Sequence, residues 1–135
     1  MIIYQEAVPG RDEFFDLFST TGWNEEEYHL SPDQLYQAIN HSWYMVSVYD
    51  RSSLVGYGRV ISDGVLHALI VDMIVHPDYQ GQGIGRTILA KLIQQCQTAG
   101  VKDVQLFCAT GKSPFYEKCG FAARPANAPG MQLKV

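Results

Sequence analysis

A run of glycine and glutamine residues carries the strongest chemical signal in this sequence. The run is Gln80-Gly81-Gln82-Gly83-Ile84-Gly85, and Arg86 follows it. It lies between an apolar segment that predicts a strand and an amphipathic segment that predicts a helix. The first N–H groups of a helix lack partners and carry partial positive charge, and glycines let an anion approach them closely. The run therefore predicts a phosphate or pyrophosphate site, with the Arg86 guanidinium beside the same anion.

Two commoner glycine-rich motifs do not fit this run. The dinucleotide-binding pattern GxGxxG requires a glycine where Arg86 stands. A Walker A loop requires Gly-Lys-Ser/Thr after the glycines, and the sequence has none. The alternative is a glycine-rich connector that binds no ligand.

Hydrophobic periodicity and turn residues predict the elements that position the run. Helices are predicted over 11–19, 31–40, 84–97 and 113–118, and Ser31-Pro32-Asp33-Gln34 is typical of a capped helix start. Strands are predicted over 2–7, 43–49, 54–61, 65–75 and 104–108, with two more near Phe121 and over 131–135. We expect one α/β (α+β) domain over residues 1–135, with a mixed, mainly antiparallel sheet of about six to seven strands and about four helices.

The composition excludes several classes of protein. The net charge of -4 and the scattered basic residues argue against a nucleic-acid partner. No apolar run reaches the roughly 18–20 residues that span a bilayer, and the start lacks a secretory signal, so we expect a cytoplasmic protein without a membrane partner. Three cysteines without CxxC spacing and four dispersed histidines predict no metal site.

Two motifs resemble the signatures of the GNAT superfamily of N-acetyltransferases. Gln80-x-x-Gly83-x-Gly85 is similar to the first, and Phe115–Phe121 to the second, while Met73–Pro77 resembles that family's fourth strand and the turn after it. The resemblance covers roughly residues 54–121 and implies acetyl-CoA as cosubstrate, with splayed fourth and fifth strands that admit the pantetheine arm. It implies that the backbone of Met73, Ile74 and Val75 bonds the pantetheine amides, and that the N–H groups of Gly81 to Arg86 bind the pyrophosphate.

The same resemblance places the phenol of Tyr116 beside the coenzyme sulfur. A phenol with an unperturbed pKa near 10 stays protonated at neutral pH and can donate its proton to the departing thiolate. The alternative is a core tyrosine packed beside Phe115 and Phe121. The attacking amine must lose a proton to Asp72, to His67 or to a water chain. Asp72 is expected to be catalytic or to order the substrate, and the alternative is a structural hydrogen bond.

The acceptor is expected to be the primary amine of a small molecule, acetylated by direct transfer in a ternary complex. In this superfamily the first two helices build the acceptor pocket, and here they supply aromatic residues (Phe18, Trp23, Tyr28 and Tyr36) beside Glu25–Glu27. An ordinary core helix with a solvated acidic turn is the alternative. The chain most resembles the arylalkylamine and serotonin branch, with some glucosamine-phosphate N-acetyltransferase features. Other hypotheses are a protein lysine or N-terminal acetyltransferase, an amino-sugar acetyltransferase and a non-catalytic acyl-CoA-binding module. Exposed terminal strands would allow a homodimer.

Overall fold

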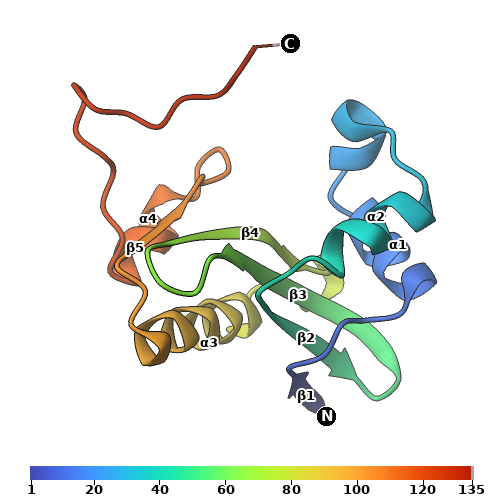
Figure 1. The fold of residues 1–135 in the computed structure, drawn as a ribbon. Helices are drawn as coiled ribbons and strands as arrows, with labels where there is room; N and C mark the ends of the chain where they lie inside the picture. The colour runs from blue at the N-terminus through green and yellow to red at the C-terminus, as the bar shows by residue number, and fades with distance from the viewer. Residues whose placement is uncertain (135) are drawn as a thin grey trace. The chain divides into compact units, whose positions relative to one another are not determined.

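The computed structural model describes residues 1–134, which form two compact units (Figure 1). The first unit, Met1–Gln105, holds nearly all of the regular structure. Its elements are β1 Ile2–Gln5, α1 Arg11–Ser19, the π-helical turn η1 Asn24–Tyr28, α2 Pro32–Ile39, β2 Tyr44–Asp50, β3 Ser53–Ser62, β4 His67–Val75, the 3-10 turn η2 Pro77–Tyr79 and α3 Ile84–Ala99. The last strand, β5 Asp103–Leu106, leads into the second unit, which contains α4 Ser113–Lys118.

The sheet has the order β1-β2-β3-β4-β5. The first four strands pair antiparallel, with Ile3 opposite Tyr49 and Tyr57 opposite Ile74, and β2, β3 and β4 follow one another as a meander. β5 begins beside the beginning of β4, because the amides of Lys102 and Asp103 donate to the carbonyls of Val65 and Leu66 at 3.3 and 2.8 Å. The predicted meander is therefore confirmed, and β4 is flanked by β3 and β5.

Helices cover both faces of the sheet in the first unit, as Figure 1 shows. Tyr57 points to the face of α1 and α2, where its ring meets Phe14 edge-on at 4.9 Å. Its neighbour Gly58 points to α3, because successive strand residues face opposite ways. A Cβ on Gly58 would lie 2.6 Å from Cγ2 of Ile88, so only glycine allows α3 to pack this closely. The apolar stripe of α3 is buried on this face.

The helix boundaries follow the capping signals of the sequence. Ser31 Oγ accepts the amide of Gln34 at 3.2 Å, and Gln34 Oε1 accepts the amide of Ser31 at 2.9 Å. This reciprocal pair is the predicted capping box, and it satisfies two donors that the helix itself cannot use. At the end of α3, Gly100 takes the left-handed conformation (φ 74°) that closes the helix.

The strand count differs from the expectation. The sheet has five strands within residues 1–134, and the strands expected near Phe121 and over 131–134 do not form, while Val135 lies outside the described residues. The physical reason is the proline content: Pro125 and Pro129 offer no N–H for a ladder, and a turn joins the amide of Ala128 to the carbonyl of Pro125 at 2.9 Å. Residues 1–134 contain four α-helices, and the π-helical and 3-10 turns add two short helical segments beyond the roughly four helices expected.

Replacing Tyr57 with phenylalanine should raise the free energy of unfolding by about 1 kcal/mol, because a buried hydroxyl without a partner carries an uncompensated desolvation cost. The Tyr57 side chain is fully buried, and its hydroxyl has no hydrogen-bond partner among residues 1–134. Burial raises the pKa of Tyr57 to about 12; Ser42 lies close enough to oppose that rise, but not in hydrogen-bonding geometry. Urea denaturation would measure the change.

Tyr49→Phe is the matched control for this prediction. The Tyr49 hydroxyl donates to Glu13 Oε2 at 2.6 Å, so its removal should lower the free energy of unfolding by about 1–2 kcal/mol. Changes of opposite sign in the free energy of unfolding would support the conclusion that the Tyr57 hydroxyl has no partner. A loss of stability in Tyr57→Phe would instead mean that an ordered water bonds the buried hydroxyl.

Candidate functional site: an open helix end beside a bulged strand

The glycine-rich loop connects the end of β4 to the beginning of α3. Two side chains anchor it to the sheet. Gln80 Nε2 donates to the carbonyl of Val75 at 3.0 Å, and the Tyr79 hydroxyl donates to Asp50 Oδ2 at 2.7 Å. The start of the loop is therefore held against the end of β4.

The N-terminus of α3 is left without a cap. Gly81 and Gly83 have φ of 80° and 85°, a conformation that other residues adopt only with strain. The first bond of the helix joins the amide of Thr87 to the carbonyl of Gly83 at 3.1 Å, and the amides of Gly81 to Arg86 donate to no backbone carbonyl within residues 1–134. These six N–H groups are the donors that a bound anion would use.

The other long helices close their beginnings with their own side chains. α1 carries Asp12 and Glu13 in its first turn, and α2 has Ser31 as its cap and Asp33 in its first turn. The first turn of α3 has neither a side-chain cap nor a carboxylate, and it carries the exposed Arg86 instead. Among α1, α2 and α3, the start of α3 is therefore the one whose electrostatics favour an anion from solution.

The residues expected to hold a coenzyme lie in sequence along this path. Met73, Ile74 and Val75 form the last residues of β4, and Ile74 is buried in the core cluster. In the loop, Gln80, Gly81, Gln82 and Gly83 are exposed, while Ile84 anchors the helix in the core. Gly85 and Arg86 complete the first turn of α3. The structure thus brings the predicted strand residues and the predicted loop together in one unit.

Asp72 occupies a bulge in β4. Two residues, Asp72 and Met73, lie opposite Gly58, and Asp72 has a φ of 56°. Its Oδ2 accepts the Nε–H of Arg59 at 2.7 Å, in a pair whose side chains are 12% and 23% exposed. Simple alternation along the strand ends at this bulge, and the carboxylate reaches the guanidinium on the neighbouring strand.

The expected acceptor region, around α1 and η1, combines aromatic rings with carboxylates. The Phe18 ring lies 5.7 Å from that of Trp23 and 6.3 Å from that of Tyr28. Partial burial raises the pKa of Tyr28, and the nearby carboxylates of Glu27 and Asp72 raise it further. The η1 turn therefore brings Tyr28 close to the bulge. Tyr28 and Tyr36 are both exposed, at 53% and 37%.

The Asn24 side chain holds the η1 turn in place. Its Nδ2 donates to the carbonyl of Leu30 at 3.0 Å, and its Oδ1 accepts the amide of Leu30 at 2.8 Å. This two-way bridge closes the loop that carries Tyr28 and the three glutamates. The aromatic and acidic residues of this region are thus presented on a constrained segment.

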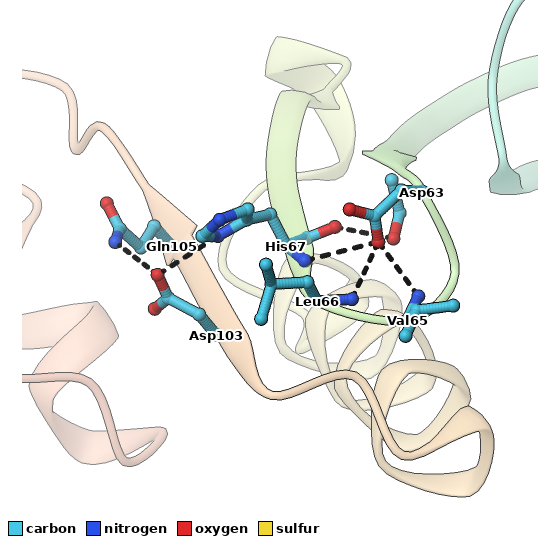
Figure 2. A network of polar contacts seen from close by, with 7 residues as sticks. Asp63, Val65, Leu66, His67, Asp103 and Gln105 are labelled. Carbon is cyan, nitrogen blue, oxygen red and sulfur yellow. Dashed lines mark hydrogen bonds and ion pairs between the residues drawn. The ribbon is translucent and has the colours of Figure 1, made fainter.

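His67 lies at the opposite end of β4 (Figure 2). Its Nδ1 is 3.3 Å from Asp103 Oδ2, which also accepts from Gln105 at 2.9 Å. The hairpin there is closed by Asp63, whose Oδ1 accepts three amides, and those bonds lower the pKa of Asp63. With a strand rise of about 3.3 Å per residue, His67 is about 26 Å from Val75. His67 therefore belongs to the hairpin and lies apart from the open helix end.

A hollow of about 360 Å³ opens beside this hairpin. It is lined by residues of β3, β4 and β5: Ile61, Ser62, Asp63, His67, Ala68, Leu69, Asp103 and Gln105. These residues lie at the end of β3, at the beginning of β4 and in β5, so the hollow is distinct from the glycine-rich loop after β4.

Tyr116 lies in α4, in the second unit. Its ring packs edge-on against Phe115 at 5.1 Å and Phe121 at 6.1 Å between centroids, as the alternative interpretation expected. Burial raises the pKa of its phenol above the usual 10, and the nearby Cys108 and Cys119 thiols add to the rise. The group therefore stays protonated well above neutral pH, as a proton donor requires.

Sequence reasoning missed Arg59. An arginine in the middle of a strand predicts only an exposed side chain, yet this one is largely buried and bonded to Asp72, to the carbonyl of Ala38 and to Ser42. The one available signal was the pairing of a mid-strand arginine with a mid-strand aspartate thirteen residues later on the next strand.

Neither a metal cluster nor a membrane-spanning helix is found in residues 1–134. No group of three or more His, Cys, Asp or Glu side chains there could hold a metal ion. Each helix in that part of the chain is too short or too polar to cross a bilayer.

Comparison with known proteins identifies the family. Residues 16–129, which include parts of both units, match the family described as "Acetyltransferase (GNAT) domain". An uncharacterized N-acetyltransferase (ycf52) of Pyropia yezoensis is 36% identical over 98 residues, which are 70% of this chain and 56% of that protein. The histone acetyltransferase TAP1 of Glycine max is 35% identical over 82 residues, 61% of this chain and 36% of that protein. The chain thus spans about half or less of the length of these relatives.

A solved structure shares the whole fold. A protein of unknown function from Staphylococcus aureus, described as a probable acetyltransferase, superposes with a TM-score of 0.85 at 25% identity, and the match covers 100% of both chains. The matched family is consistent with the glycine loop and the uncapped start of α3. The chain belongs to the GNAT family of acetyltransferases.

Proposed function

We propose that this chain moves the acetyl group of acetyl-CoA to the primary amine of a small molecule, by direct transfer in a ternary complex. The observation that carries the proposal is the open N-terminus of α3, where six amides of Gly81 to Arg86 have no backbone acceptor in the described part of the chain. In the proposal they bind the coenzyme pyrophosphate, with Arg86 beside it. Gln80 fixes the loop through its bond to Val75.

The pantetheine arm is proposed to lie along the last residues of β4. β5 starts beside the beginning of β4, through the bonds of Lys102 and Asp103, and has only four residues against nine in β4. A gap between the two strands toward their ends would leave the outer backbone groups of Met73, Ile74 and Val75 free for the pantetheine amides. In this arrangement the thioester would lie beside β4, the strand that also carries Asp72.

Two side chains are proposed to handle the reaction's protons. Tyr116 donates its phenolic proton to the coenzyme thiolate as the tetrahedral intermediate collapses, and its raised pKa keeps that proton in place. Asp72 orders the amine: its Oδ2 is held by Arg59, while Oδ1 makes no hydrogen bond within residues 1–134 and is free to accept from the amine or from a water that takes its proton. The same proposal covers residues 1–135 as one acetyltransferase domain.

The acceptor is proposed to be a small cationic arylalkylamine. Tyr28 lies near both Glu27 and Asp72, and an aromatic ring beside carboxylates is a combination that attracts an ammonium group attached to a flat ring. One observation favours a second candidate, a lysine side chain of a protein, because the relative TAP1 is named a histone acetyltransferase. A cytoplasmic location, a homodimer, and the absence of a metal, a nucleic-acid partner and a membrane partner stay predictions.

A screen of amines would test the proposal. Arylalkylamines, polyamines, amino sugars and lysine peptides would each be incubated with acetyl-CoA while release of free coenzyme A is followed. We expect kcat/KM for an arylalkylamine to exceed that for the other classes by at least about tenfold. Activity with amino sugars alone would overturn the choice of branch, and preference for the peptide would favour the second candidate. Absence of coenzyme A release with every amine, despite tight binding of acetyl-CoA, would indicate a non-catalytic binding module.

A further inference from the structure

Arg59 connects β4, which is proposed to bind the coenzyme, with α2, which belongs to the expected acceptor region. It lies in β3 and is 12% exposed. Its Nε–H donates to Asp72 in the bulge of β4 at 2.7 Å, and its Nη1 donates to the carbonyl of Ala38 near the end of α2 at 3.2 Å. A single guanidinium thus connects the strand of the coenzyme with a helix of the acceptor region.

The bulge that Arg59 contacts is strained. Three residues other than glycine have positive φ in the described chain: His29, Arg51 and Asp72. His29 ends the η1 turn and Arg51 lies in the turn between β2 and β3, where such a conformation is common. Asp72 alone adopts it inside a strand, so a tertiary contact must hold it there. The ion pair to Arg59 is the side-chain contact that Asp72 makes within residues 1–134.

The bulge decides how the rest of β4 is oriented. Beyond it, Ile74 lies opposite Tyr57 and enters the cluster under α1 and α2. Met73 turns to the α3 face, where its Sδ would lie 2.9 Å from a Cβ on Gly58. A strand without the extra residue would exchange these two faces, because side chains alternate with a period of two. The bulge therefore sets the direction of every group from Met73 to Val75.

We propose that Arg59 is a positioning residue for acetyl transfer. By holding the Asp72 carboxylate it maintains the bulge, and the bulge aligns Met73–Val75 with the pantetheine arm. By donating to the carbonyl of Ala38 it also holds the end of α2 beside the bulge. Arg59 contacts neither substrate and acts only through Asp72 and the backbone. The inference rests on the proposed function for its effect on turnover, but the effect on the bulge is independent of it.

Two measurements on Arg59→Met would test the proposal. Amide hydrogen exchange of the peptide around residues 70–76 reports the bulge directly, and we expect protection there to fall by at least about tenfold. With an accepted amine, kcat should fall by about 10- to 100-fold through misalignment. The dissociation constant of coenzyme A should change by less than about threefold, because the glycine loop holds the pyrophosphate. Arg59→Lys, which keeps the charge but not the fork of donors, should lie between these values.

The choice of residue at position 72 separates geometry from charge. Asp72→Gly and Asp72→Ala both remove the carboxylate, but only glycine adopts a φ of 56° without strain. In an Arg59→Met background, Asp72→Gly should restore the protection of residues 70–76, and Asp72→Ala should not. If Arg59 acts through Asp72, adding Arg59→Met to Asp72→Gly should lower kcat by less than about threefold.

Arg11→Met is the matched control. Arg11 makes an exposed ion pair with Asp33 at 2.8 Å, joining α1 and α2 away from β4, and its loss should leave both measurements unchanged. Unchanged exchange at residues 70–76 in Arg59→Met would overturn the proposal, as would changed exchange with full turnover. If the wild-type chain acetylates no amine, the proposed function fails, while the exchange data still decide whether Arg59 holds the bulge.

Discussion

Replacing Gly83 with alanine is expected to weaken the binding of acetyl-CoA by roughly 10- to 100-fold, measured as the dissociation constant by calorimetry. Gly83 has a φ of 85°, which costs an L-residue roughly 1–2 kcal/mol. The added methyl group would meet no protein atom within 4 Å, so steric exclusion inside the chain is not the cause. The loss would come from amides that turn away from the pyrophosphate to relieve the strain.

Gly100→Ala is the control for this variant, since Gly100 closes the other end of α3 with a φ of 74° and has equally open surroundings. Both variants should lose about 1 kcal/mol of stability, but only Gly83→Ala should lose acetyl-CoA affinity. Acetyl-pantetheine, which lacks the nucleotide and its pyrophosphate, should be used equally well by Gly83→Ala and by the wild type. Equal affinity for acetyl-CoA in the two variants would remove the glycine loop from the site.

Replacing Tyr116 with phenylalanine is expected to lower kcat by about 10²- to 10³-fold, with little change in KM for either substrate. The variant retains the ring that packs between Phe115 and Phe121 and removes only the proton that the thiolate needs. Steady-state kinetics with acetyl-CoA and the amine selected in the screen would measure the loss.

The pH dependence of kcat provides a second check on Tyr116. Because its pKa is raised above 10, the wild-type enzyme should keep its acid through neutral and mildly alkaline pH and lose activity only above pH 10. That alkaline limb should be absent from Tyr116→Phe. Tyr4→Phe, far from α4 in sequence and in the first unit, should behave as wild type. Unchanged turnover in Tyr116→Phe with normal thermal stability would assign Tyr116 to packing alone.

The sequence predicted those elements whose local signals agree with their tertiary environment. The Ser31–Gln34 box and the Gly100 cap define helix ends by short-range hydrogen bonds, so their boundaries were recognisable. The glycine loop was recognisable for the same reason, because positive φ at Gly81 and Gly83 requires that residue type. The two strands expected near Phe121 and over 131–135 depended instead on pairing with other parts of the chain.

The site was less predictable where it depends on strand register. Alternation could not foresee the bulge at Asp72, because the register shift and the contact with Arg59 both involve a neighbouring strand. The only local indication of the bulge was the residue type, because aspartate is among the residues that best tolerate a left-handed backbone. His67 was a candidate because it shares β4 with Asp72, but position along a nine-residue strand separates it from the glycine loop.

The uncapped start of α3 also has a consequence for how this chain can evolve. Its other helices show that the sequence can supply Ser, Asp or Glu at such positions, and one substitution near Gly83 could do the same. Such a cap would stabilise the unliganded protein but would compete for these amides with the coenzyme that we propose they bind. Selection for thermal tolerance alone would therefore drift toward a stable, inactive chain. Selection in the presence of coenzyme would keep this helix start uncapped, because in the proposed complex the ligand itself serves as the cap.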